Sequence, residues 1–278
     1  MAYKTILLVL NEVGRAPQLI ETARVLARKF GAHISGLYVI PGIIAYPSDG
    51  LSMGIGVGSF DGHRKQFLEG LHNVRGAFET AMRSDDISFD LHVVNSDIAI
   101  ISTDVIENCR AADLIVVSAV DRENASSVEN DFVEQVVLAA GRPVLVLPFR
   151  GEYKIDYDNI VLAWNGSKES ARAAFDGLDF MRTAKSTRIV TIDKMPETKL
   201  FAMDIAESLD RNGVDCEFTK LNSSGGSVGE TLLTATKDYG AGLLILGAYG
   251  HNRLTEWVFG GTTRHVLRNL NCPILMSH

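Results

Sequence analysis

Four glycines stand where an apolar stretch ends and a helical pattern begins, in the segment LLILGAYGHNRLTEWVFGGTTRHVL (residues 243–267). They are Gly247, Gly250, Gly260 and Gly261. Glycine lets backbone N–H groups approach an anion without a side chain in the way, and the free N–H groups and dipole at a helix start favour phosphate. The spacing therefore fits a phosphate-binding loop. The same glycines are equally compatible with tight turns alone, which are common in α/β proteins.

Other patterns that could support chemistry lack the context that the chemistry needs. GGSVG (residues 225–229) matches the G-x-S-x-G of a hydrolase nucleophile, but Ser227 is placed to cap a helix, and no ordered acid and histidine complete a triad. His251 and His265 flank the glycines without a third residue to orient either as a base. The three cysteines are far apart, which suggests neither disulfides nor a zinc site. We therefore expect no catalytic residues and no metal site.

The strands and helices that must position the glycines belong to a unit that is repeated in the sequence. KTILLVLNEVG near the start matches DNIVLAWNGSK from Asp158, and AADLIVVS with GRPVLVLP matches GAGLLILG with NCPILMSH. Each half alternates five strands with helices, which predicts right-handed crossovers and a doubly wound parallel sheet. The expected domains are residues 1–150 and 151–278. The first half also carries an additional glycine-rich segment at residues 41–62, before its second helix.

Local signals in the sequence predict where helices begin, end and face the core. Ser167 and Ser227 are expected N-caps, and Gly31 is expected to end the first helix. After Ser167 the apolar residues that fall on one helical face are Ala171, Ala174, Phe175, Leu178 and Met181. If the first and fourth strands of each half are neighbours, the loops after Trp164 and Leu246 face each other where the strand order reverses. Ligands bind at that place in open parallel sheets.

The spacing G-x2-G-x9-G after the fourth strand, with AWNGS after the first, resembles the universal stress protein (UspA) family, here as a tandem pair. The resemblance is strong over residues 158–278 and looser over residues 1–150. It implies two five-stranded α/β domains of Rossmann-like, adenine-nucleotide-alpha-hydrolase-like fold, related by a pseudo-twofold axis. It also implies an adenine nucleotide as partner, ATP as the cofactor, and Mg²⁺ only if ATP is bound. Carried over to this sequence, the family's nucleotide contacts fall on Asn165, Ile192 or Asp193, Leu246, Gly247, Gly250, Gly260, Gly261 and Thr262.

Two of these positions depart from the family pattern. Asn165 stands where the family's ATP-binding members have an acidic residue, so it can hydrogen-bond adenine but carries no charge. Gly261 takes the place of a Ser or Thr, which removes a hydroxyl from the expected phosphate contact, although Thr262 follows directly. These departures favour a rival function in which the site is empty.

The first half departs further from the pattern. Ser118 and Asp121 correspond to the first two motif glycines, and a carboxylate at position 121 would repel a phosphate. The residue after its first strand is Asn11. We therefore expect the first half to be a structural partner without a nucleotide site of the family type.

Composition and charge narrow the class of partners. The net charge of −7 over 278 residues argues against nucleic acid and anionic membranes, and no apolar run approaches the roughly 20 residues of a membrane span. The start of the chain carries no cleavage site of a signal peptide, so a reducing cytoplasm is the expected location.

The expected function is an adenine-nucleotide-binding stress-response or regulatory module that is not an enzyme. Two alternatives stay open. One is a stress protein that acts through protein partners with both sites empty. The other is a weak ATPase or autophosphorylating protein that uses the hydroxyls of Thr262 or Thr263. Family members pair through their fifth strands, which predicts an internal pseudo-dimer and leaves a homodimer of chains open.

Overall fold

The computed structural model describes residues 3–42, 57–121, 128–151, 153, 155–193, 200–223, 225–249 and 261–278. Strands alternate with helices along the chain, and the neighbouring strands within each half run parallel, so the α/β fold class is confirmed. The chain forms two compact units, one made of Tyr3–Val136 and the other containing Val137–His278.

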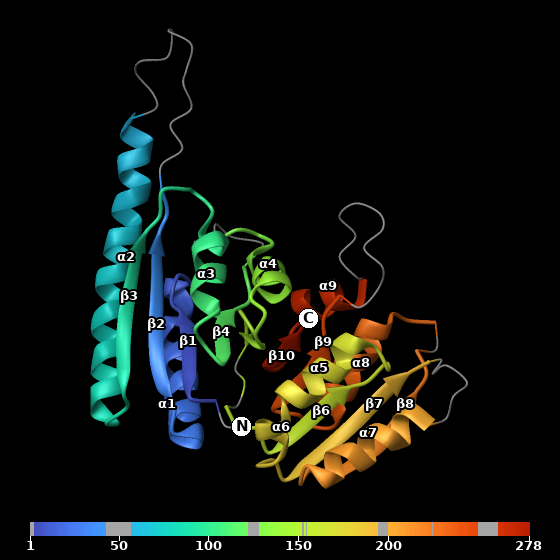
Figure 1. Ribbon diagram of the computed structural model, residues 1–278. Helices are drawn as coiled ribbons and strands as arrows, with labels where there is room; N and C mark the ends of the chain where they lie inside the picture. The colour runs from blue at the N-terminus through green and yellow to red at the C-terminus, as the bar shows by residue number, and fades with distance from the viewer. Residues whose placement is uncertain are drawn as a thin grey trace. The chain divides into compact units, whose positions relative to one another are not determined.

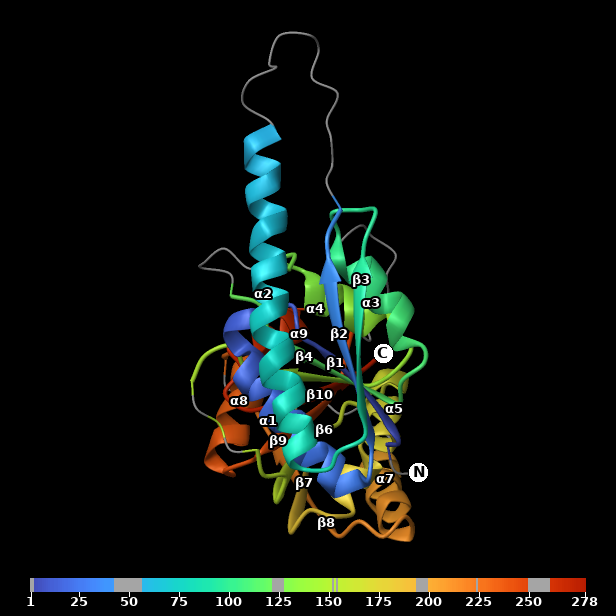
Figure 2. The same cartoon turned by 90° about the vertical axis from the view of Figure 1, so that its left-hand side faces the viewer.

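The N-terminal unit contains four parallel strands in the order β3-β2-β1-β4. Its strands are β1 (Thr5–Val9), β2 (His33–Ile40), β3 (Phe89–Asn95) and β4 (Leu114–Ser118), and its helices are α1 (Ala16–Phe30), α2 (Val57–Ser84) and α3 (Ile101–Cys109), with a short 3-10 helix at Val13–Arg15. α4 (Phe132–Ala139) spans the boundary between the units. Figure 2 shows α2 alongside the strands β2 and β3. The approach is close, because a Cβ at Gly36 of β2 would lie 3.0 Å from the Phe78 ring of α2.

The C-terminal unit contains the strands in the order β5-β10-β9-β6-β7-β8. Its strands are β5 (Val144–Leu147), β6 (Asn159–Ala163), β7 (Ser186–Ile192), β8 (Cys216–Leu221), β9 (Leu243–Gly247) and β10 (Ile274–Ser277), and its helices are α5 (Lys168–Asp176), α6 (Leu178–Met181), α7 (Leu200–Arg211), α8 (Val228–Asp238) and α9 (Gly261–Arg268). The order β8-β7-β6-β9 repeats that of β3-β2-β1-β4, as the internal repeat predicts. Right-handed crossovers place α5 and α7 on one face of the sheet and α8 on the other (Figure 1).

The fifth strands of the two halves pair with each other, as expected. β5 runs antiparallel to β10, with Leu145 opposite Leu275. This pairing explains why the packing boundary falls at Val136/Val137, ahead of the expected domain boundary at residue 150. Strand β5 belongs to the first half of the sequence but packs in the C-terminal unit.

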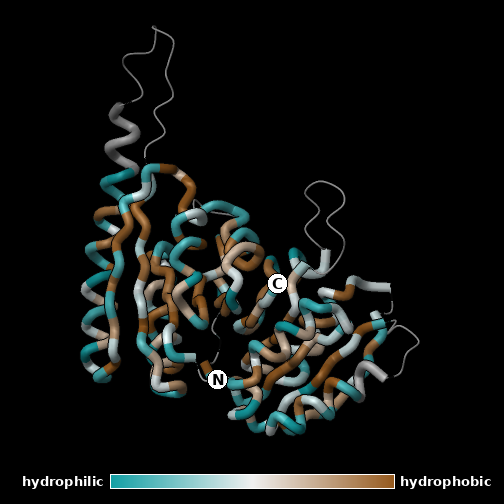
Figure 3. The backbone as a smooth tube through the Cα atoms, in the orientation of Figure 1, coloured by the Kyte–Doolittle hydropathy of each residue, from teal (hydrophilic) through white to brown (hydrophobic). Residues whose placement is uncertain are grey.

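The cores form where strands are covered on both faces. All residues of β4, β5 and β10 are buried, whereas the outer strands β3 and β8 are half-exposed. Figure 3 shows this distribution: the inner strands are hydrophobic, whereas helices such as α2 alternate between hydrophobic and hydrophilic residues. The short apolar runs in the sequence are therefore buried strands, as continuous runs in parallel sheets usually are.

The predicted helix ends are confirmed with some corrections. Gly31 adopts the left-handed conformation after α1 (φ 60°), and the Ser167 hydroxyl accepts a hydrogen bond from the Ser170 N–H at 3.1 Å. The helix after Ser167 breaks at Gly177, and Phe175, expected inward, is 47% exposed. α2 begins at Val57, so the last residues of the expected glycine-rich segment 41–62 are helical, although glycine costs a helix interior about 1 kcal/mol. Residues 43–56 of that segment lie outside the described residues.

Candidate functional site

The strand order of the C-terminal unit creates a switch point between β6 and β9. The chain leaves β6 towards β7 on one side and later returns to β9 on the other, so the order reverses at this pair. The two strands are parallel, and Ala163 at the end of β6 lies opposite Leu246 near the end of β9. Residues that follow these two strands therefore meet at one edge of the sheet (Figure 1). This is where open α/β sheets bind ligands.

Asn165 stands at this edge with an exposed side chain. Its Oδ1 accepts a hydrogen bond from the Ser167 N–H at 3.0 Å, which shapes the turn into α5. Since this bond uses only the oxygen, the amide N–H2 group stays exposed as a donor. An exposed donor at this edge is what an adenine-binding role for Asn165 requires.

Gly247 is held against the first turn of α5. A Cβ on this residue would lie 2.4 Å from both the carbonyl carbon of Glu169 and the backbone nitrogen of Ser170. Those are backbone atoms, so the first motif glycine has a packing reason that is independent of any ligand. Its neighbour Leu246 is buried, so that only the backbone of this residue can reach a ligand.

Ile192 ends β7 at the same edge, and Asp193 follows it. Asp193 has φ 59°, and its carboxylate accepts a hydrogen bond from the Ser223 N–H at 2.7 Å. Hydrogen bonds from the Ser223 backbone and side chain lower the pKa of Asp193 below its ordinary value. The charged carboxylate thus fastens the end of β7 to the segment after β8. The half-buried Ile192 lies directly before it.

The start of α9 carries the remaining predicted contacts. Gly261 is exposed, and a Cβ on it would meet no atom within 4 Å, so packing does not require glycine there. Thr262 is half-exposed and Thr263 is buried, which leaves the hydroxyl of Thr262 as the more accessible of the two. Gly250 and Gly260 lie outside the described residues, and their roles remain predictions.

Glu169 is a functional candidate that the sequence reasoning missed. Its side chain is 3% exposed, in the first turn of α5 beside Gly247, and its Oε2 is buried without a hydrogen-bond partner in the described part of the chain. Burial opposes its ionisation, but hydrogen bonds from its own N–H, from Ser167 and from Lys168 lower the pKa of the carboxyl. The sequence signal that could have identified Glu169 is an acidic residue in the first turn of a helix, where the helix dipole stabilises a negative charge. It adds a negative charge close to the expected phosphate region.

At the corresponding edge of the N-terminal unit the equivalent side chains are buried. Asn11 is fully buried; its Nδ2 donates to the Val39 carbonyl at 2.7 Å, and its Oδ1 accepts from the Val39 N–H at 3.0 Å. Ser118 is buried and donates to the Ala119 carbonyl, and Asp121 is buried as well. The asparagine that is exposed in one half is therefore a structural tie between β1 and β2 in the other.

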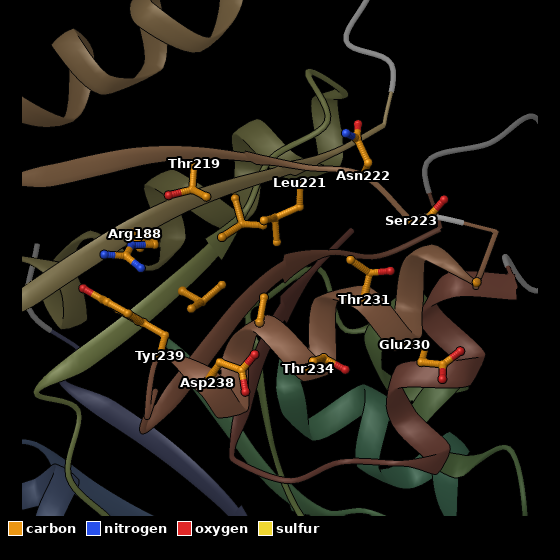
Figure 4. Close-up of a pocket in the computed structure, with 14 residues that line it drawn as sticks. Arg188, Thr219, Leu221, Asn222, Ser223, Glu230, Thr231, Thr234, Asp238 and Tyr239 are labelled. Atoms are coloured by element: carbon orange, nitrogen blue, oxygen red, sulfur yellow. The ribbon is translucent and has the colours of Figure 1, made fainter.

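A hollow of the C-terminal unit borders this edge at Ser223, whose N–H is bonded to Asp193. It has a volume of about 520 Å³ and is lined by residues of β6, β7, β8, the following segment and α8, shown in Figure 4. None of the site residues predicted from the sequence lines it. In the part of the chain that the structure describes, no group of three or more His, Cys, Asp or Glu side chains is placed to hold a metal ion, and no helix is long and apolar enough to cross a membrane.

Comparisons with known proteins find similarity to one family. The model of the universal stress protein family matches residues 156–278. The chain is 24% identical over 296 residues to the universal stress protein Slr1230 of Synechocystis sp. (strain ATCC 27184 / PCC 6803 / Kazusa), covering 98% of this chain and 99% of that protein. A crystal structure of a universal stress protein from Archaeoglobus fulgidus DSM 4304 superposes with a TM-score of 0.73 at 14% identity, covering 98% of this chain and 97% of the other. The similarity to the crystal structure shows that the shared fold extends over 98% of this chain.

Proposed function

Since residues 156–278 match the model of the universal stress protein family, we propose that this chain is a stress-response module that binds one adenine nucleotide. The site is the edge formed by the ends of β6, β7 and β9 and the start of α9. ATP is the proposed ligand, with Mg²⁺ entering only as the companion of its phosphates. The module acts as a binding and regulatory protein and not as an enzyme.

The observation that carries the proposal is the contrast between the two equivalent asparagines. Asn165 is exposed at the switch point, with its amide nitrogen free to face a base, while Asn11 is fully buried and hydrogen-bonded to both backbone groups of Val39. A ligand at the first site would have to break a buried tie, whereas a ligand at the second would not. The proposed stoichiometry of one nucleotide per chain follows from this difference.

Binding without catalysis fits the groups at this edge. Thr263 is buried, so Thr262 is the accessible hydroxyl beside the start of α9. The Glu169 carboxylate is enclosed beside the backbone of α5, where it can influence a charged ligand but is poorly placed to take a proton from solvent. Labelled ATP incubated with the protein should therefore be recovered unhydrolysed, without phosphate transferred to the chain.

Isothermal calorimetry with ATP tests the proposal. Asn165→Leu should weaken binding by about three- to tenfold through loss of a hydrogen bond, and Gly250→Asp should abolish it by adding bulk and like charge. Asn222→Leu is the matched control, since Asn222 is another exposed asparagine at a strand end of the same unit. No measurable heat with the parent protein would instead favour the rival function, a stress protein that acts through protein partners with an empty site.

A further inference from the structure

The strand β3 ends the sheet of the N-terminal unit, and among the described strands it pairs only with β2 (Figure 1). The Ser96 N–H, directly after the strand, donates to the Ile40 carbonyl, so the even-numbered residues of β3 turn their backbone groups towards β2. The backbone groups that point away from the sheet belong to Phe89, Leu91 and Val93. They form a row of donors and acceptors that another strand can bind.

One face of β3 is apolar and only partly covered by α2. On this face the Leu91 Cδ1 would lie 2.9 Å from a Cβ at Gly36, and the Phe89 ring lies 5.5 Å from the Phe78 ring of α2. Phe89, Leu91 and Val93 all remain half-exposed. The strand therefore carries apolar side chains up to its open edge.

The helix α2 exposes a leucine along the same edge. The Nη2 of Arg64 donates to the Asn95 Oδ1 at 3.1 Å, which places this flank of α2 beside the end of β3. Leu68 follows Arg64 by one helical turn, so it lies on the same flank, and it is 46% exposed. Apolar groups of both β3 and α2 are thus exposed along one edge of the unit, and covering them would be favourable.

The opposite face of β3 carries two groups of opposite charge. Asp90 is half-exposed and His92 is exposed, and the two stand two residues apart on this face. The Asp90 carboxylate contacts His33 at 2.9 Å and His92 at 3.1 Å. An acid and an imidazole with this spacing can pair with the same two groups of an antiparallel copy of the strand.

A twofold axis at Leu91 satisfies both faces of the strand at once. Two copies of β3 then run antiparallel, with Leu91 opposite its own copy and Phe89 opposite Val93, and these pairs use the outward backbone groups. Asp90 of each copy lies opposite His92 of the other, in the non-hydrogen-bonded positions where cross-strand side chains are closest. An axis shifted to His92 would instead place the two imidazoles opposite each other.

The strand at the other end of the sheet order, β8, lacks this self-complementarity. Leu221 accepts a hydrogen bond from the Asp193 N–H, so its backbone groups face inward and those of Phe218 face outward. An axis at Phe218 would place Glu217 opposite Thr219, without an opposite charge across the pair. The two edges therefore differ, and β3 is the one that fits a second copy of itself.

From these observations we infer that two copies of the chain associate through their β3 strands. The pairing is antiparallel about a twofold axis at Leu91, with Asp90 and His92 paired across the axis and an α2 helix of each copy beside it. The surface belongs to the N-terminal unit, whereas the nucleotide edge belongs to the C-terminal unit. The inference therefore does not depend on the proposed function.

Sedimentation equilibrium of the whole protein over a wide range of concentrations tests the association. The mass should rise from 30.3 kDa to twice that value as the concentration increases. Val93→Pro should weaken association by about tenfold or more, because each copy loses an outward N–H that bonds the other. An edge strand tolerates a proline whose missing N–H faces outward. Phe218→Pro, at an outward-facing position of β8, is the matched control and should leave association unchanged.

Charge substitutions test the register. His92→Glu should weaken association by about tenfold, because carboxylates then face each other on both sides of the axis, and Asp90→Lys should weaken it by removing the attraction. Mixing these two variants should restore association, because the introduced acid and base then lie opposite each other. Lys220→Glu, an exposed position on β8, is the control and should have no effect.

Circular dichroism confirms that each variant is folded, and His92→Glu provides the decision if Val93→Pro or Asp90→Lys is not. A parent protein that stays at 30.3 kDa at every concentration would overturn the inference. So would a dimer that a folded Val93→Pro or His92→Glu variant leaves intact, or two folded charge variants that do not associate when mixed.

Discussion

Replacing Gly247 with alanine separates the packing role of the first motif glycine from a role in binding. The added Cβ would lie 2.4 Å from two backbone atoms of α5, the carbonyl carbon of Glu169 and the nitrogen of Ser170. Side-chain ends could rotate away, but backbone atoms at this distance move only if β9 or α5 shifts. Overpacking of a core typically costs 1–3 kcal/mol, and the backbone contact places this variant at the upper end, about 3 kcal/mol. For a chain of this size we expect the midpoint of thermal unfolding to fall by roughly 6–12 °C.

Gly261→Ala is the matched control within the same motif. A Cβ there meets no atom within 4 Å, so the variant should be as stable as the parent, or more stable by up to about 1 kcal/mol because the unfolded chain loses freedom. Differential scanning calorimetry of the three proteins without ligand measures both effects. Parent-like stability of Gly247→Ala, combined with lost ATP binding, would refute the packing argument and assign the glycine to the ligand alone.

Three further predictions concern buried polar groups. Asn11→Ala should lower the free energy of unfolding by about 2–4 kcal/mol, because it leaves two backbone groups of Val39 unpaired. Asn165→Ala should change this free energy by less than about 1 kcal/mol. Urea titrations measure both variants, and equal losses would contradict the contrast between the two halves. Burial raises the pKa of Cys109 and of Cys272 to about 12. Brief treatment of the folded protein with iodoacetamide at about pH 8 should therefore modify the half-buried Cys216 first. Early labelling of Cys109 in peptide mass spectra would be inconsistent with this order. The pKa of Glu169 is lowered in the folded state. Its ionisation therefore stabilises the fold above the ordinary carboxyl pKa of about 4.3, and this stabilisation is lost as the pH falls through the lowered value. The difference in unfolding free energy between the parent and Glu169→Gln should shrink between about pH 7 and pH 3, and a difference that stays constant over this range would argue against the lowered pKa.

Much of the fold could be predicted because it depends on local signals and on repetition. Buried strands read as short apolar runs, Ser167 and Gly31 mark helix ends, and the repeated units lead to the repeated strand order. Packing between distant segments was harder to predict. Phe175 has the right helical spacing to be buried, but the helix breaks at Gly177 and the side chain is exposed. β5 belongs to the second unit because of a partner strand more than 100 residues later.

The candidate site was predicted as a set of residue types, and the structure adds what each contacts. Spacing could not reveal that Gly247 faces the backbone of α5, since the contact joins two segments nearly 80 residues apart. Nor could it distinguish Asn11 from Asn165, which follow similar strands and differ only in what surrounds them. The cavity over β7 and β8 arises from side chains on four elements, none of which forms a motif. Such features depend on tertiary packing, which a single sequence does not display.

Native mass spectrometry of the whole protein at increasing ATP measures how many adenine nucleotides one chain binds, and we expect one, in the C-terminal unit. One mass increment of ATP should saturate the parent chain, and this increment should disappear in Gly250→Asp and remain in Asn222→Leu. A second increment of equal affinity, or no increment at saturating ATP, would rule out a single nucleotide site per chain.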